Sequence, residues 1–453
     1  MVNVGARASF AGSASASIGR RVTETVDPFP QMAPPLEGTP PPVAGDGFKP
    51  GREILAYYAV VGLYFFAFGL QAVVFPSLIT FVLQEDAHRL GYAQMALSAP
   101  FFALLLFGGL LAERVRAGPA LFILQLAFAA PPMALAAAAY FHAISYSAAI
   151  AYAVLMGSLA AFMLPVRDAA LNGVVAREAA RGHVIPLTRA AATATAVQLG
   201  AQIAGLLTGA MAQQDPGPFL VIQAVAVVLS AGVALFLRGE KPVVEARTVK
   251  AAFGDIGAGL KYAFGDPVMG PMLWTAGYIG VFIIGSFQVL FPLIIRDTYG
   301  GGAEELGRLL ATFFGASFVS AVIVGRLPSF KFPGRALLIS HMLAAAVLAT
   351  FAIEKPMWAF TALVVMWGLG AGVTMSTSRT ITQASADPAY LGRVLAIYSM
   401  GFMGGAPIGS WLIGQTAHHF GLAAASLLPA IGLAAAAVAL AMFSPIWKMR
   451  RLI

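Results

Sequence analysis

Long apolar runs follow one another along most of this sequence, and they constrain its fold more than any other feature. A helix crosses roughly 30 Å of hydrocarbon with about 20 apolar residues. Twelve runs of this length can be marked: 54–83, 92–112, 119–141, 146–166, 186–212, 217–238, 268–295, 305–327, 335–353, 357–380, 391–416 and 421–446. Only 11% of the residues are charged, against about 25% in soluble domains. These properties exclude a soluble enzyme and predict an all-α membrane protein with 12 transmembrane helices.

The Lys and Arg residues predict the orientation of these helices. With the N-terminus in the cytoplasm, four of the 28 fall on the outer side: Arg89, Arg296, Arg308 and Lys355. The others lie on the cytoplasmic side or at cytoplasmic helix ends, as expected because short basic loops resist translocation. We predict a multi-pass protein of the cell inner (plasma) membrane, embedded in the lipid bilayer, with both termini cytoplasmic. The net charge of +8 then reflects topology, and no nucleic-acid partner is expected.

Composition divides the chain into five parts. The first 52 residues are rich in Ser, Ala and Gly and then in Pro, without apolar periodicity, which is typical of a disordered segment. A longer charged connection follows the sixth span. We predict a disordered cytoplasmic tail over 1–52, an N-terminal six-helix bundle over 53–238, a cytoplasmic central loop over 239–267, a C-terminal six-helix bundle over 268–447 and a cytoplasmic C-terminus over 448–453.

The two predicted bundles repeat each other in sequence. Gly69, Phe75 and Pro76 in the first span recur 216 residues later as Gly285, Phe291 and Pro292 in the seventh. The fifth span reads GAQIAGLLTGAMA from Gly200, and the eleventh reads GAPIGSWLIGQTA from Gly405. Because six spans separate the members of each pair, both copies cross the membrane in the same direction. We interpret this as a parallel duplication, although small residues in any closely packed membrane helices also produce such similarity.

Three stretches carry a resemblance to a known family: GLLAERVRAG from Gly109, PVRDAALNGVVARE from Pro165, and SRTITQASADPAYLGRVLAIYSMGFMGGAPIGS from Ser378. With the 6+6 spans, they resemble the major facilitator superfamily of secondary transporters, and the last two resemble its branch of siderophore and macrolide efflux proteins. The resemblance implies two six-helix bundles of major facilitator type. It also implies that Glu113 and Arg114 lock the cytoplasmic gate. Four further charged residues at inner helix ends either form salt bridges between helices that close this gate or carry protons: Arg167, Asp168, Arg379 and Arg393.

The carboxylates avoid the centres of the predicted spans. All 20 Asp and Glu residues lie in the tail, in loops or at helix ends. We therefore expect a nearly neutral central cavity that favours an apolar or amphipathic substrate. The candidate titratable groups are Glu53, Glu113, Asp168 and His341. His341 lies less than two turns beyond Arg335, so we expect it to form a hydrogen bond at headgroup level.

A few polar and aromatic residues reach the middle of the spans. Spans 1, 4, 7 and 10 line the cavity in the family that the sequence resembles, and Gln198 and Gln202 share one face of the fifth span. These side chains either contact substrate or only bridge and pack neighbouring helices. The predicted substrate contacts are Tyr64, Gln71, Gln198, Gln202, Tyr278, Gln288 and Trp367.

Three functions remain open. The first is a secondary active transporter that exports a small amphipathic molecule by alternating access, coupled to protons through acids at helix ends. The second is a carrier of a lysophospholipid or another lipid. The third is a non-transporting receptor or scaffold that uses the tail and central loop for docking. A monomer is expected in each case.

Neither an enzyme nor a cofactor is predicted. The chain has no Cys, no phosphate-binding Gly-rich loop and no H-E-x-x-H motif. His418 and His419 adjoin the outer loop before the last span, and no third ligand lies near them in the sequence. We therefore expect them to be polar loop residues, and we predict no metal site.

Overall fold

The structure is a computed structural model that describes residues 51–212, 215–238, 249–326, 330–385 and 391–450. Residues 1–50 of the predicted tail, 239–248 of the predicted central loop and 451–453 of the predicted C-terminus lie outside these residues. The N-terminal half contains α1 (Arg52–Ser77, continued by a π-helical segment, Leu78–Val82), α2 (Ala87–Ala112), α3 (Ala117–Tyr140), α4 (Tyr146–Ala180), α5 (Leu187–Gly209, followed by a 3-10 turn, Ala210–Ala212) and α6 (Gly217–Ala234). The segment between the halves contains α7 (Val249–Gly265).

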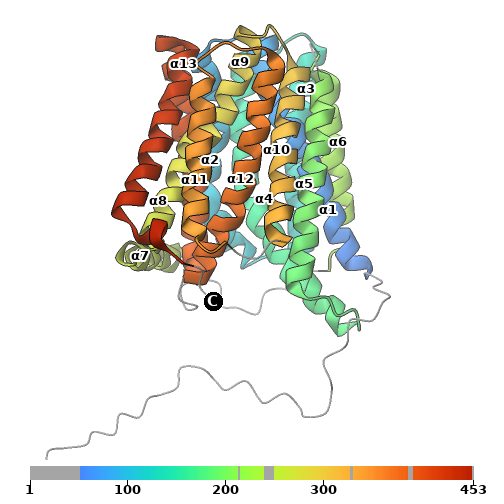
Figure 1. Cartoon of the computed structure of the whole chain (residues 1–453). Coiled ribbons are helices and arrows are strands. Elements are labelled where there is room, and N and C mark those ends of the chain that lie inside the picture. The colour runs from blue at the N-terminus through green and yellow to red at the C-terminus, as the bar shows by residue number, and fades with distance from the viewer. Residues whose placement is uncertain (1–50, 213–214, 239–248, 327–329, 386–390, 451–453) are drawn as a thin grey trace, which may run out of the picture. The chain divides into compact units, whose positions relative to one another are not determined.

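The C-terminal half begins with α8 (Met269–Ile279), two π-helical segments (Gly280–Ile284 and Ser286–Leu290) and α9 (Phe291–Asp297), which together form one span. It continues with α10 (Ala303–Arg326), α11 (Pro333–Thr350), α12 (Met357–Ser385), α13 (Leu391–Phe443) and a 3-10 turn, Pro445–Lys448. Figure 1 shows the helices other than α7 running side by side along one direction.

Twelve membrane crossings arise from these helices, as predicted. Eleven segments of the described chain are long and apolar enough to cross a membrane. The last of them, Ala396–Phe443, has 48 residues and would extend about 72 Å as one straight helix. Gly421, with φ of 81°, interrupts it, so α13 comprises two successive helices. Its left-handed backbone is one that glycine adopts without a steric penalty.

The repeated glycines form equivalent close contacts in the two halves. A Cβ on Gly69 of α1 would lie 2.1 Å from the backbone oxygen of Gln202 on α5. A Cβ on Gly285 would lie 2.6 Å from the carbonyl carbon of Gly409 on α13. Both glycines therefore let two backbones touch where any side chain would hold the helices apart. The duplication seen in the sequence corresponds to the same helix pair packed twice.

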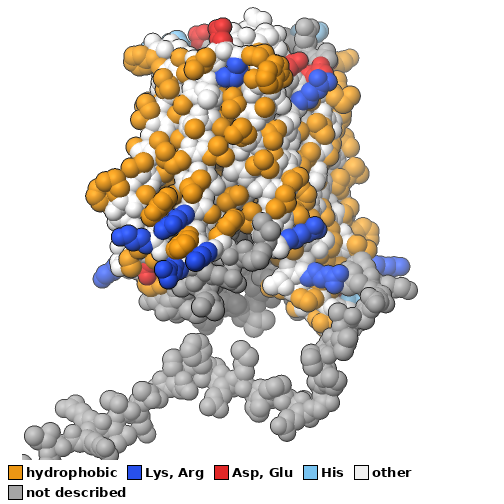
Figure 2. Space-filling model, in the orientation of Figure 1, with side chains coloured by type: hydrophobic (Ala, Val, Ile, Leu, Met, Phe, Trp, Pro, Cys, Tyr) orange, Lys and Arg blue, Asp and Glu red, His pale blue; other side chains and the backbone are white. Residues whose placement is uncertain are grey.

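The two ends of the helix bundle differ in charge. We call the end where α1 begins and the turn Pro445–Lys448 lies the proximal end, and the end with the loops 83–86 and 298–302 the distal end. On the face shown in Figure 2, Lys and Arg side chains gather near the proximal end, whereas the visible Asp and Glu side chains lie mainly at the distal end. The predicted topology assigns the proximal end to the cytoplasm.

Candidate functional site

The predicted substrate contacts of the N-terminal half lie on α1 and α5. Gln71 is buried, and its Oε1 has no hydrogen-bond partner in the structure. Gln202 is also buried, whereas Gln198, one turn earlier on α5, is partly exposed. Tyr64 is buried against the ring of Phe128, with the centroids 5.5 Å apart. The structure thus leaves Gln71 with a spare acceptor and places Tyr64 in aromatic packing.

In the C-terminal half, two of the predicted contacts already have polar partners. The Tyr278 hydroxyl and His341 Nδ1 lie 2.7 Å apart, and Ser410 Oγ donates to Gln288 Oε1 at 2.6 Å. His341 is fully buried near the middle of α11, so the expectation of a headgroup-level hydrogen bond is wrong. The position follows from the packing of α11 against α12 and α13, which distance along the chain from Arg335 does not reveal.

Trp367 lies in an aromatic cluster of the C-terminal half. Its ring stacks on Phe287, with centroids 4.6 Å apart and an interplanar angle of 12°. Phe291 and Phe313 approach edge-on at 5.8 and 5.4 Å. The side chain is buried, and its Nε1 has no hydrogen-bond partner in the structure. Most of the Trp367 surface is therefore committed to packing, while one donor remains unpaired.

The predicted gate residues fall into three groups. Arg167 and Asp168 form an ion pair on α4, with Arg167 Nη2 and Asp168 Oδ1 2.6 Å apart. Glu113 is half-buried and Arg114 is exposed at the end of α2. Arg379 and Arg393 lie on α12 and α13, and their side chains are outside the described part, so ion pairs between helices that involve them stay a prediction.

The Arg167–Asp168 pair is strongly asymmetric in its exposure. The Arg167 side chain is 8% exposed and lies over the ring of Phe65 at 4.8 Å, whereas the Asp168 side chain is 61% exposed. Arg167 Nη1 is buried and has no hydrogen-bond partner among the described residues. Because the two residues are neighbours in sequence, this pair lies within one helix and does not itself join two helices.

A second charged network at the proximal end was not predicted as a unit. Glu53, at the start of α1, is paired with Arg177 and Arg181 from the end of α4, each at 2.7 Å. Its backbone N–H donates to Glu178 Oε1 at 3.2 Å. The hydrogen bond to Glu53 raises the pKa of Arg181. The sequence marked Glu53 only as a titratable group, since its partners lie more than 120 residues away.

Hydrogen bonds join the two halves at the distal end. Arg296, at the end of α9, donates through Nη1 to the backbone oxygens of Thr80 at 3.4 Å and Glu85 at 2.8 Å. Backbones also meet across this boundary: a Cβ on Gly91 of α2 would lie 2.7 Å from the Ser410 oxygen on α13. These contacts hold the distal ends of the halves together.

Helix α5, which packs against α10 of the other half, becomes more exposed toward the proximal end. Near the distal end, Gly205, Gly209 and Ala210 are buried, and a Cβ on Gly307 of α10 would lie 2.5 Å from Ala210 Cβ. Between Leu187 and Ala196, exposed positions cover roughly 240° of the helix at about 100° per residue. This part of α5 therefore packs against its neighbours along one stripe and is exposed around the rest of its circumference.

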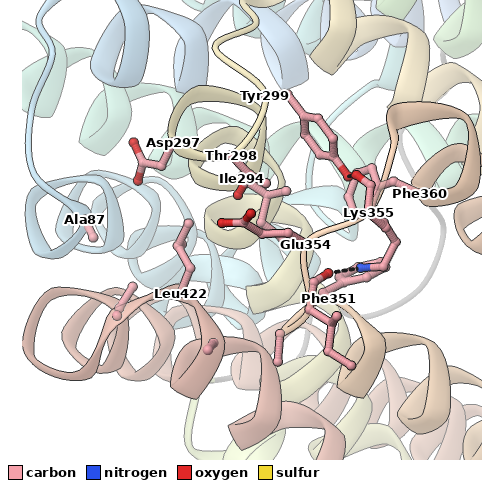
Figure 3. Close-up of a pocket in the computed structure, with 15 residues that line it drawn as sticks. Ala87, Ile294, Asp297, Thr298, Tyr299, Phe351, Glu354, Lys355, Phe360 and Leu422 are labelled. Atoms are coloured by element: carbon pink, nitrogen blue, oxygen red, sulfur yellow. Dashed lines mark hydrogen bonds between the residues drawn. The ribbon is translucent and has the colours of Figure 1, made fainter.

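Two cavities lie at the distal end. One of about 410 Å³ is lined by Asp297, Tyr299, Glu354, Lys355 and aromatic side chains (Figure 3). Burial lowers the pKa of Lys355, and burial together with Glu354 raises the pKa of Tyr299. The other cavity, of about 660 Å³, is lined by residues that include Arg296, Glu304 and Asp86. Neither contains any of the seven predicted substrate contacts.

The expectation that His418 has no further ligand nearby is wrong. His418 and His419 lie within α13 and not in a loop. The fold brings Asp86 and His88, from the start of α2, to His418, with one potential ligand atom of each within 4.8 Å of the others. The sequence could not show this cluster because His88 and His418 are 330 residues apart.

Comparison with known proteins identifies the family. The model of a family described as transmembrane secretion effectors, a branch of the major facilitator transporters, matches residues 69–451. The chain belongs to this family. A search of curated proteins finds no match to this transporter. The family assignment confirms the predicted major facilitator type, and the siderophore and macrolide efflux branch stays a prediction.

Solved structures of transporters share the fold. A nucleoside transporter, NupG, has a TM-score of 0.68 and 14% identity, over 88% of this chain and 99% of its own. A POT family transporter in complex with 5-aminolevulinic acid has a TM-score of 0.68 and 10% identity, over 88% and 97%. The human organic anion transporter MFSD10 has a TM-score of 0.60 and 13% identity, over 86% and 99%. The predicted fold class of two six-helix bundles is thereby confirmed.

Proposed function

We propose that this transporter exports a small amphipathic molecule across the inner membrane by alternating access, coupled to the entry of protons. Alternating access requires two halves that close around a central site at one end while they separate at the other. The observation that carries the proposal is the difference between the two ends of α5. Its distal part is buried where the halves meet, and its proximal part is exposed around most of its circumference.

The character of the interior supports an amphipathic substrate. The predicted contacts are amides, phenols and an indole, with no carboxylate or ammonium group among them. Within the described part of the chain, Gln71 Oε1 and Trp367 Nε1 are buried without a hydrogen-bond partner, and such groups normally have one in proteins. A neutral molecule with an apolar body and one or two polar groups would satisfy them. A multiply charged substrate would meet no opposite charge at these positions.

The Arg167–Asp168 pair is the proposed proton site. Asp168 is largely exposed, so water can deliver a proton to its carboxylate. Protonation would remove the negative charge that pairs with Arg167. Arg167 would then be a buried cation without its partner, with Nη1 already unpaired. Because such a cation is unfavourable, protonation of Asp168 favours rearrangement of the proximal end.

Dye uptake into everted membrane vesicles tests this function. A panel of amphipathic fluorescent dyes serves as the probe, with an imposed gradient that makes the vesicle lumen acidic. We expect the transporter to accumulate at least one dye only while the gradient lasts, and a protonophore to stop it. Asp168→Asn is expected to lower the gradient-driven rate at least about 10-fold, since a positioned proton-transfer group contributes about 100-fold or more.

The control variant is Asp215→Asn, an exposed aspartate in a distal loop whose Oδ1 accepts a hydrogen bond from Gly217 N–H. It is expected to transport dye at the wild-type rate. Equal rates for the wild type and Asp168→Asn would remove Asp168 from the coupling mechanism. Dye movement that ignores the gradient would refute proton coupling altogether.

The lipid carrier and the scaffold make different predictions. A lipid carrier would move a fluorescent lysophospholipid between the leaflets of proteoliposomes at a rate that the protonophore does not change. A scaffold would show neither activity, and it would depend on residues 1–50. Dye transport that survives deletion of these residues would exclude the scaffold.

A further inference from the structure

The strongest unassigned feature is the cluster of Asp86, His88 and His418 at the distal end. Asp86 and His88 belong to the N-terminal half, at the start of α2, and His418 belongs to the C-terminal half, on α13. Asp86 and His418 are exposed and His88 is half-buried, so an ion can reach the cluster from solvent. Two imidazoles and a carboxylate form a donor set that divalent zinc favours.

The separation of the two imidazoles matches a shared zinc ion. His88 Nδ1 and His418 Nδ1 lie 3.3 Å apart. Two nitrogens at about 2.05 Å from a tetrahedral zinc ion lie roughly 3.3 Å apart, because the angle between them is about 109°. A direct hydrogen bond between the rings is the other interpretation, but 3.3 Å is longer than the usual range of about 2.7 to 3.2 Å for N–H donors.

The Asp86 carboxylate is available for a metal ion. Asp86 occupies the N-cap position of α2, where an Asp side chain commonly accepts a hydrogen bond from a backbone N–H of the first turn. Here the side chain makes no such bond. Its distance to the imidazole nitrogens is at most 4.8 Å, which exceeds a coordinated spacing by no more than about 1.5 Å, and a rotation of the side chain can close this gap. Water would complete the tetrahedron.

We propose that Asp86, His88 and His418 form a zinc site that joins the two halves of the transporter at its distal end. The ligands come from both halves, so the site is complete only when the distal ends are together. Zinc then stabilises the state with a closed distal end, because it binds that state more tightly than the open one. At a zinc concentration about 100 times the Kd of the site, the equilibrium shifts toward the closed distal end about 100-fold. Zinc on the distal side therefore inhibits transport, a consequence that rests on the proposed alternating access.

Calorimetric titration tests the site itself. Zn²⁺ is titrated into the purified full-length protein, without a polyhistidine tag, in detergent. We expect one ion per chain. His88→Ala and His418→Ala, one in each half, are each expected to weaken zinc binding at least about 100-fold. Losing a residue that only hydrogen-bonds to a metal ligand already weakens binding by up to about 100-fold, and a ligand itself contributes at least as much. Asp86→Asn is expected to weaken it less, because the amide oxygen still reaches the ion.

His419→Ala is the matched control. His419 is the next residue on α13, is also exposed, and lies beside His418 with ring centroids 4.8 Å apart, but it is not part of the cluster. It is expected to bind zinc as the wild type does, and the double variant His88→Ala/His418→Ala is expected to bind zinc at least as weakly as either single variant. Wild-type affinity in His88→Ala or in His418→Ala would overturn the proposal, as would complete loss in His419→Ala.

Inhibition is measured separately in the everted vesicles, where the distal side faces the lumen. Zinc loaded into the lumen is expected to slow dye uptake by the wild type and leave His418→Ala unaffected. Zinc that binds with the expected ligand dependence but does not slow uptake would overturn the inhibitory role. A wild type that moves no dye would instead refute the proposed function, and the calorimetric result would still decide the metal site.

Discussion

Replacing Glu53 by Gln tests whether the network between α1 and α4 stabilises the N-terminal half. The Glu53 side chain is 3% exposed, and Arg177 approaches it with Nε at 2.8 Å and Nη2 at 2.7 Å. Gln preserves the size of the side chain. However, it removes the negative charge and turns one oxygen into an NH₂ group, which faces a guanidinium donor.

The expected cost follows from burial. Removing one partner of a buried ion pair costs about 3–5 kcal/mol. Arg177 is 21% exposed, so the lower value of about 3 kcal/mol applies. We add nothing for Arg181, because it is exposed to solvent. For a unit of 150–250 residues, this free energy corresponds to a fall in melting temperature of roughly 6–12 °C.

Far-ultraviolet circular dichroism in detergent measures the melting temperature. Trp fluorescence is unsuitable, because all five Trp residues lie beyond residue 270, in the C-terminal half. The control is Glu304→Gln, which breaks an exposed pair with Arg308 one turn away and is expected to cost under 1 kcal/mol. If Glu53→Gln melts within about 2 °C of Glu304→Gln, the buried network contributes no more to stability than an exposed ion pair, and the reasoning is refuted.

Two further predictions concern the packing within and between the halves. Gly409→Ala places a Cβ 1.9 Å from the Val281 backbone oxygen, and it is expected to abolish the peak of folded protein in size-exclusion chromatography. The control Gly200→Ala has open space around the new Cβ and is expected to fold normally. Equal yields of folded protein from the two variants would contradict the close approach at Gly409. Arg296→Gln removes hydrogen-bond donors to the backbone of the other half. Spin labels attached at Tyr140→Cys and Ile353→Cys, both exposed at the distal end, are then expected to be far apart in a larger fraction of the molecules. The chain has no Cys of its own, so labels attach only there, and an unchanged distance distribution would show that Arg296 does not hold the distal end closed.

The sequence alone was sufficient for the fold. Each span is a local run of apolar residues whose length must match the membrane, so twelve spans could be marked without knowing any contact. The repeated glycines likewise identified the duplicated helix pair, since only glycine permits backbones to touch at Gly69 and Gly285. The break at Gly421 lies at the first residue of the twelfth predicted run, directly after the gap that the sequence had left between the last two runs.

Side-chain partners were decided by the tertiary structure alone. A transmembrane helix is apolar on nearly all faces, so its periodicity does not show which residue faces which neighbour. The position of Glu53 beside Arg177, of His341 beside Tyr278 and of His88 beside His418 depends on how each helix is rotated and where it meets another. These contacts span from 63 to 330 residues of chain. The sequence therefore determined how often the chain crosses the membrane, and the packing of the helices determined which polar groups meet.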